Sequence, residues 1–182
     1  MNKKLLIPVL AIAFLMLATP IFASGATTGY FVGKGAVAWS LYNPDHGYYM
    51  TIIVITSMGT EFTPNFETIM LAIVTDSSGS QIWFADNYLA MGEFKWSMGL
   101  ATLSTTVDYF GVPTQLTAQW QAIRPAVNQN YHYVAGAYHV IINGPVRDAS
   151  ATATLGGLTF YYIPGPFFAF LQLNAEVTIT KS

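Results

Sequence analysis

The feature that most constrains the fold is an unbroken alternation of side-chain types from Gln115 to Ala122. Every second position is polar, and the positions between them are small or apolar: Leu116, Ala118, Trp120 and Ala122. Because successive side chains of a β-strand face opposite sides of a sheet, the pattern predicts a half-buried strand. We expect Trp120 to be a large core side chain beneath a polar outer face.

Short stretches with strand-like patterns recur along the chain, separated by turn sequences rich in Gly, Pro, Asn and Asp. The expected strands are 36–42, 48–57, 68–75, 80–85, 93–109, 115–123, 131–142, 148–155, 158–162 and 173–179. They predict an all-β fold, a single antiparallel β-sandwich of about nine or ten strands, with a barrel as the second choice.

Single residues predict finer features of this arrangement. Gly99 is expected to mark a bulge or bend inside its strand, and residues 86–91 to form a short helical turn. Residues 143–145 (Asn-Gly-Pro) are expected to end the preceding strand. The strand 148–155 directs three alanines inward, which predicts a large partner opposite them, with Trp120 as the candidate.

The first residues have the pattern of a secretory signal peptide. A basic start (residues 1–4) precedes an apolar run over 5–17 and then small residues. We expect residues 1–23 to be cleaved off, with cleavage as late as Ala26 as an alternative. The apolar run is too short for a stop-transfer helix, so no membrane span is expected after cleavage, and an uncleaved anchor is the weaker alternative.

Cleavage would leave 159 of the 182 residues, enough for one domain with a sizeable core. Residues 24–34 are expected to be a flexible N-terminal arm and residues 35–182 the β-sandwich domain. The chain has no cysteine, which excludes disulfides and lipid attachment at a lipobox cysteine. We therefore expect a secreted domain, extracellular or periplasmic, that is held together by its core alone.

Charge is scarce, because charged residues are 9% of the chain, against about 25% in typical domains. Removing residues 1–23 takes away two lysines and no acid, so the formal net charge changes from −2 to −4. The remaining cations are scattered, which excludes an electrostatic surface for nucleic acid. A surface of Thr, Ser, Gln, Asn and Tyr suits contact with other surfaces or with sugars.

Part of the chain resembles a known group of proteins. Residues 116–120, 147–154 and 177–180 are similar to a group of uncharacterised secreted bacterial β-sandwich proteins. These pair an early strand of small residues and Trp with a late Arg-x-Ala-x-Ala-Thr strand. The resemblance lies mainly in the C-terminal half, implies a secreted β-sandwich, and brings no activity or catalytic residue.

His132 and His139 are the first candidates for a metal site. On one uninterrupted strand they would face opposite sides, whereas a tight turn at Gly136 would bring them onto neighbouring strands. With Asp45 or Asp148 they would then form a metal site. Zinc motifs have tighter spacing, so we favour Tyr and His on a half-exposed sheet face, and we predict no metal and no cofactor.

Residues 76–80 carry side-chain oxygens at alternate positions, as calcium loops do. Asn87 stands where such a loop needs a bidentate Glu, so a plain hairpin turn is favoured. Calcium held between loops is left open, with four candidate ligands: Asp45, Asp76, Asp86 and Asp108.

Catalytic signals are poor, since the chain has no Gly-x-Ser-x-Gly motif and no cysteine nucleophile. The acid pairs Glu61/Glu67 and Asp86/Glu93 have the chemistry for glycoside hydrolysis. Nothing in the sequence sets their separation, so a hydrolase is the least favoured hypothesis.

Tyrosines exceed what one core needs, and exposed Tyr and Trp stack on sugars and anchor protein interfaces. We prefer a non-catalytic structural or self-assembling protein of the cell surface or envelope, whose arm adds a strand to a neighbour. Its partners would be further copies or other surface proteins. The alternative is a module that binds carbohydrate or another ligand, with or without calcium. Its candidate binding residues are Tyr131, His132, Tyr133, Tyr138, His139 and Trp83.

Overall fold

The computed structural model describes residues 28–58, 67–97, 99–135, 138–163 and 168–181, and none of them is helical. Accordingly, no described helix is long and apolar enough to cross a membrane. Eleven strands occupy these ranges: β1 (Thr28–Asn43), β2 (Tyr48–Met58), β3 (Glu67–Thr75), β4 (Gln81–Leu89), β5 (Phe94–Ser97), β6 (Leu100–Tyr109), β7 (Val112–Ala122), β8 (Val127–Ala135), β9 (Tyr138–Leu155), β10 (Leu158–Tyr161) and β11 (Phe168–Lys181).

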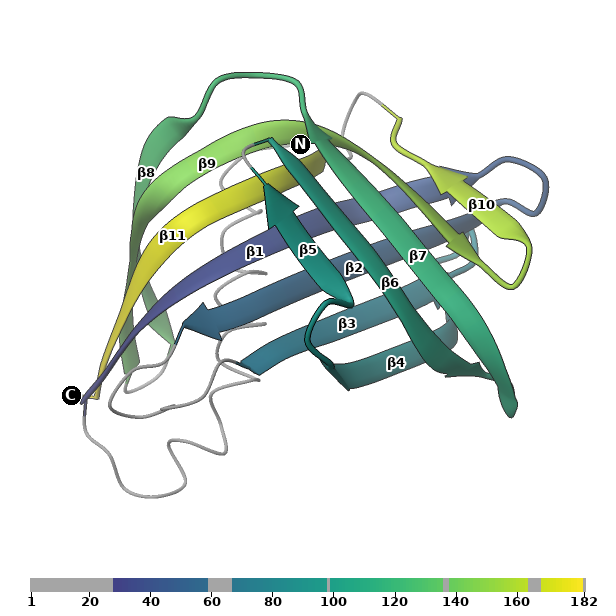
Figure 1. The fold of residues 1–182 in the computed structure, drawn as a ribbon, viewed down its shortest axis with the longest axis horizontal. Coiled ribbons are helices and arrows are strands. Elements are labelled where there is room, and N and C mark those ends of the chain that lie inside the picture. Colours follow the sequence, from purple (N-terminus) through teal and green to yellow (C-terminus); the bar gives the residue numbers. More distant parts are fainter. Residues whose placement is uncertain (1–27, 59–66, 98, 136–137, 164–167, 182) are drawn as a thin grey trace.

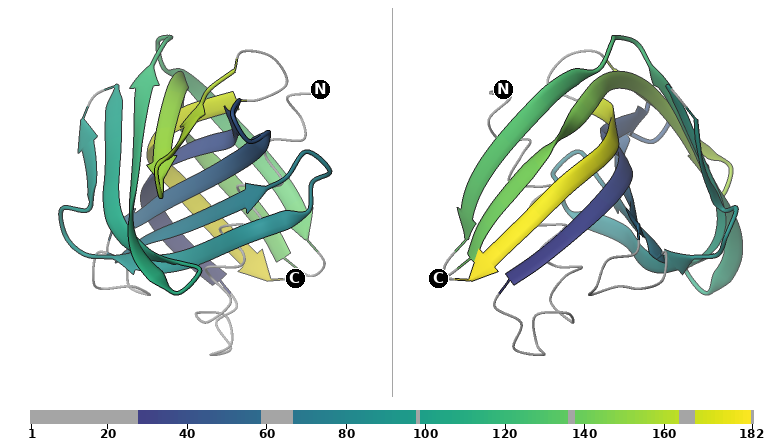
Figure 2. Two further views of the ribbon diagram at one scale, coloured as in Figure 1. Left: turned by 90° about the vertical axis from the view of Figure 1, so that its right-hand side faces the viewer. Right: turned by 60° about the vertical axis from the view of Figure 1, so that its left-hand side comes forward.

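The strands form one antiparallel sheet in the order β4-β3-β2-β1-β10-β9-β7-β6-β5, which does not close into a barrel. Off this path, β11 pairs with β1 and β9, and β8 pairs with β9. The sheet curls so that β5, β6 and β7 cross over β1 to β4 (Figure 1 and Figure 2). The predicted all-β antiparallel fold is confirmed, and the two layers expected of a sandwich are the two halves of one continuous sheet.

The first strand is longer than the sequence predicted. β1 begins at Thr28, pairs with β11 from that residue on, and pairs with β2 from Val32. Residues 28–34 of the expected flexible arm are therefore strand, because two neighbouring strands satisfy a backbone whose side chains carry little strand signal. Residues 24–27 lie outside the described part of the chain.

β9 also runs through a predicted break, over residues 143–145. Pro145 lies opposite Asn128 on β8, and the register with β11 shifts between Gln172 and Glu176, beside this stretch. A proline that cannot donate a backbone hydrogen bond is tolerated at such an irregularity. The long β9 can therefore bind β8 and β11 with its first half and β7 and β10 with its second.

Gly99 closes a turn and does not mark a bulge. Ser97 pairs with Leu100, and Gly99 has a φ of 94°, a left-handed conformation that glycine adopts at little cost. The expected strand 93–109 is thus the hairpin of β5 and β6. The helical turn expected at 86–91 is absent, because β4 continues to Leu89.

Trp120 lies at the centre of the core and is fully buried. Its register partners, Ala101 on β6 and Ala151 on β9, are 0% and 3% exposed and leave room for the indole. Phe94 meets it edge to face, with ring centroids 6.4 Å apart. Trp120 and the alanines of 148–155 do pack together, but Trp120 is not opposite them as predicted: it pairs with Ala151 on the neighbouring strand, in the same layer. The other layer contributes Met50, Ile52, Val54, Met70 and Val74.

Replacing Trp120 with alanine should lower the free energy of unfolding by about 3–5 kcal/mol, because a large cavity opens between two alanines. Its neighbour Gln119 is exposed on the other face, so Gln119→Ala should change that free energy by no more than about 0.5 kcal/mol. Urea unfolding followed by circular dichroism measures both. Equal stability of the two variants would place Trp120 outside the core.

Candidate functional site

Trp83, expected as an exposed platform for a ligand, belongs to the core. Its side chain is 5% exposed, and its Nε1 donates a hydrogen bond to the carbonyl oxygen of Asp108 at 2.8 Å. The ring also packs edge to face on Tyr109, with centroids 5.7 Å apart. This hydrogen bond joins β4, which ends the strand order, to β6, with which it forms no strand pair. Trp83 therefore has a structural role.

The other five predicted binding residues lie on the β8–β9 hairpin. His132 is opposite Ile141 and His139 opposite Val134, so the histidines stand on neighbouring strands, as a turn at Gly136 would require. On the same strands, the predicted tyrosines are Tyr131 and Tyr133 of β8 and Tyr138 of β9. The side chains of these residues lie outside the described part of the structure, so their role in binding stays a prediction.

Three of the acids proposed as calcium ligands or catalysts accept hydrogen bonds within turns. Asp76 Oδ1 accepts hydrogen bonds from the backbone N–H groups of Ser78 and Ser80, at 2.8 and 3.0 Å, and from the Ser78 hydroxyl at 2.6 Å. The favoured hairpin turn at 76–80 is therefore confirmed.

Two further carboxylates are engaged in the same way. Glu93 accepts hydrogen bonds from the Ala90 N–H and the Thr105 hydroxyl. Asp108 accepts one from the Gly111 N–H at 2.6 Å. Among the described side chains, no three His, Asp or Glu residues are placed to hold a metal ion.

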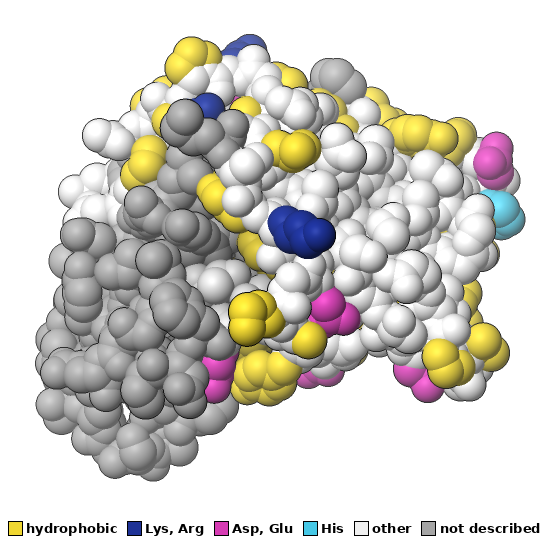
Figure 3. All heavy atoms as spheres, in the orientation of Figure 1, with side chains coloured by type: hydrophobic (Ala, Val, Ile, Leu, Met, Phe, Trp, Pro, Cys, Tyr) yellow, Lys and Arg dark blue, Asp and Glu magenta, His cyan; other side chains and the backbone are white. Residues whose placement is uncertain are grey.

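The outer face of β6, β7 and β9 is covered with hydroxyl and amide groups. The Thr117 and Thr154 hydroxyl oxygens lie 2.6 Å apart, and Gln115 Nε2 donates to Ser104 Oγ at 3.0 Å. Figure 3 shows that the surface over β5, β6 and β7 has few charged side chains. Such a surface can exchange hydrogen bonds with water or with neutral hydroxylated ligands.

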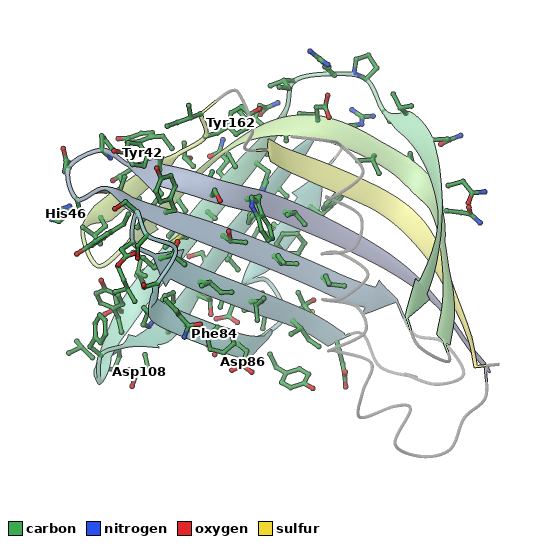
Figure 4. The ribbon with its side chains drawn as sticks, turned by 180° about the vertical axis from the view of Figure 1, so that it is seen from behind. Tyr42, His46, Phe84, Asp86, Asp108 and Tyr162 are labelled. Carbon is green, nitrogen blue, oxygen red and sulfur yellow. The ribbon has the colours of Figure 1, made fainter. Side chains whose placement is uncertain are left out.

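Three tyrosines continue this face across the fold. Tyr161 of β10 is opposite Tyr42 of β1, and Tyr42 is opposite Tyr49 of β2. Each is next to a fully buried residue, so all three lie on the outer face: the buried neighbours are Phe160, Leu41 and Met50. We call Tyr161, Tyr42 and Tyr49 the tyrosine row; Figure 4 shows Tyr42 near the end of β1, beside the turn that holds His46.

The tyrosine row offers aromatic rings between polar neighbours. Tyr161 is 49% exposed, Tyr42 and Tyr49 are partly exposed, and the rings of the last two lie with centroids 5.1 Å apart. The register extends the row to Thr152 on one side and to Thr75 on the other. The arrangement combines exposed aromatic surface with hydroxyl groups and contains no charged residue.

Asn43 fixes the junction on which the row depends. It is 2% exposed, and its Nδ2 donates to the Thr159 carbonyl at 2.8 Å, which ties the end of β1 to β10. Its Oδ1 accepts the backbone N–H of His46 at 2.9 Å and so also orders the β1–β2 turn. A buried amide whose groups are all used in this way holds Tyr42 beside Tyr161.

Sequence reasoning found the surplus of tyrosines but not this row. The outward direction of Tyr42, Tyr49 and Tyr161 follows from alternation within each strand. The neighbourhood of Tyr42 and Tyr161 depends on pairing between β1 and β10, which are far apart in the chain and leave no local signal.

No protein-family model matches the chain, and neither does any curated protein or solved structure. The resemblance to secreted β-sandwich proteins therefore stays a prediction. What the tyrosine row binds has to follow from its chemistry.

The Ser78 hydroxyl is the main cause that lowers the pKa of Asp76 from 3.8, followed by the Ser80 N–H. A pKa lowered by folding means stability that is present above pH 4 or so and is lost as pH falls through the folded pKa. Ser78→Ala should raise this pKa, as followed by NMR titration of the carboxyl carbon. Ser77→Ala, in the same turn, should leave it unchanged, and an equal rise would contradict the assignment.

Proposed function

We propose that the protein is a non-catalytic, exported domain that binds a neutral polysaccharide along the tyrosine row. One observation supports this most: three tyrosines lie on three adjacent strands, flanked by threonines on the same outer face. Sites for sugars combine an aromatic surface with a few well-placed polar groups. Export would follow from the signal peptide predicted at residues 1–23.

The spacing of the row favours a chain over a single sugar. Adjacent strands lie about 4.8 Å apart, close to the length of one pyranose unit in an extended polysaccharide. Tyr161 and the packed pair of Tyr42 and Tyr49 can therefore contact consecutive units of one chain, while Thr152 and Thr75 reach hydroxyl groups at either end.

The absence of charge along the row favours a neutral ligand. Sulfated or uronic-acid polymers are bound through Arg and Lys, which are not among the five residues from Thr152 to Thr75.

Binding without cleavage fits the described carboxylates of Asp76, Glu93 and Asp108, which accept hydrogen bonds within turns.

Self-association is the second candidate function, and the outer face of β2, β3 and β4 favours it. Alternation directs Ile69, Leu71 and Ile73 outward there, half-buried, next to Phe84, which is 42% exposed. The occupant we infer is a second copy, because an aliphatic face with Asp86 in it does not suit anionic lipid headgroups.

The small area of this face is the reason why self-association is the second and not the first candidate function. Three or four strands about 4.8 Å apart and nine residues long cover on the order of 500 Å², less than the roughly 800 Å² per partner of a stable interface. Association through this face would therefore be weak.

Tyr161→Ala and Tyr42→Ala should each weaken polysaccharide binding roughly tenfold, since one stacked ring is lost. Native affinity electrophoresis through gels that contain β-glucan, galactomannan or alginate measures the retardation. Tyr88→Ala is the control, because Tyr88 is 71% exposed on β4 and outside the row. No retardation in any neutral polymer, or equal weakening by Tyr88→Ala, would refute the proposal.

Leu71→Lys should abolish any concentration-dependent rise of the sedimentation coefficient, because a charge at the centre of the aliphatic face must stay hydrated. The added lysine stands opposite Asp86, so folding should tolerate it. Gln121→Lys, on the exposed outer face of β7, should leave association unchanged. A wild-type chain that stays monomeric at all concentrations would remove this second function.

A further inference from the structure

Arg147 lies on the inner side of the curled sheet. It precedes Ala149 and Ala151 by two and four positions on β9, and both alanines are core residues, 0% and 3% exposed. The register is regular over this stretch, so alternation directs Arg147 to the same side. Asp148 is exposed on the opposite side and pairs there with Arg124 at 3.3 Å.

The guanidinium group of Arg147 lies next to Gly99, in the turn between β5 and β6. Its Nη1 lies 3.7 Å from the point that a Cβ on Gly99 would occupy, and the Cβ of Ala122 lies 3.5 Å from the same point. The Ala122 N–H donates to the Gly99 carbonyl at 2.8 Å, which fixes the turn against β7. The guanidinium group therefore lies beside two small residues, Gly99 and Ala122, whose backbones are hydrogen-bonded to each other.

This cation has no counter-charge in the described part of the structure. Its Nε is shielded from solvent and has no hydrogen-bond partner. The nearest acid in sequence, Asp148, is taken by Arg124 on the other face. A buried Nε–H without an acceptor is costly, because it loses its hydration and gains no hydrogen bond, while the residue as a whole is partly exposed and can be reached by a ligand.

We infer that Arg147 is the anchor of a binding site for an oxyanion, a carboxylate or a phosphate, which enters beside the β5–β6 turn. The planar guanidinium presents parallel N–H groups that match two oxygens of such a group. The neighbouring Ala122 and Gly99 suit a ligand whose remaining part is apolar. The site is independent of the tyrosine row, since it lies on the inner side of the sheet and selects charge.

The test is thermal unfolding of the full chain and of Arg147→Met, Arg147→Lys and Arg124→Gln, titrated with phosphate, acetate and octanoate at constant ionic strength. A ligand at a hundredfold excess over its Kd should raise the melting temperature of wild type by about 5–10 °C, in a saturable way. Arg124→Gln should respond like wild type, Arg147→Lys less, and Arg147→Met not at all. If octanoate raises the melting temperature at a lower concentration than acetate does, the ligand is an apolar acid. If only phosphate raises it, the ligand is a phosphate.

A second readout separates binding from a merely structural role. Without added anion, Arg147→Met should be at least as stable as wild type, because the variant no longer buries an N–H group without a hydrogen-bond acceptor. Lower stability of both Arg147→Met and Arg147→Lys, with no saturable response of wild type, would mean that the guanidinium is paired within the chain. An equal response of wild type and Arg147→Met would reduce the effect to bulk salt. Either result overturns the inference.

Discussion

The packing of one indole between two alanines supports the rest of the structure. Trp120 occupies the space left by Ala101 and Ala151, so β6, β7 and β9 can lie in one layer while a single large ring reaches toward the other. The indole N–H is buried without a partner, so its stabilising contribution comes from packing and burial and not from a hydrogen bond. With no disulfide available, this contact and the aliphatic side chains facing it must hold the curled sheet together.

Curling one sheet onto itself gives the molecule two unlike outer faces. The half that contains β6, β7 and β9 presents hydroxyl and amide groups, whereas the half that contains β2 and β3 presents Ile69, Leu71 and Ile73. The tyrosine row lies where the two halves meet at β1 and β10. In a chain with so little charge, the two outer faces thus differ mainly in how many hydrogen bonds their side chains can form.

The sequence predicted what alternation within a strand decides, and missed what pairing between strands decides. Trp120 and the inward alanines of β9 were found because apolar and polar residues exchange at every step. The role of Gly99 was misjudged, since a glycine inside a strand-like pattern signals a bend or a turn equally well. The break expected at Pro145 was wrong, because a register shift in β11 accommodates the proline. Tyr42 and Tyr161 meet only through the pairing of β1 with β10, for which the sequence holds no local signal.

The pairing of the first described strand with the last has a consequence for how the protein is made. Thr28 at the start of β1 lies opposite Thr180 near the end of β11, so this ladder forms only when the whole chain is present. High contact order of this kind slows folding, because a long loop must close before its contacts contribute. The sheet therefore cannot be completed while the chain is being synthesised, and the native topology is reached only after the C-terminal residues have been released.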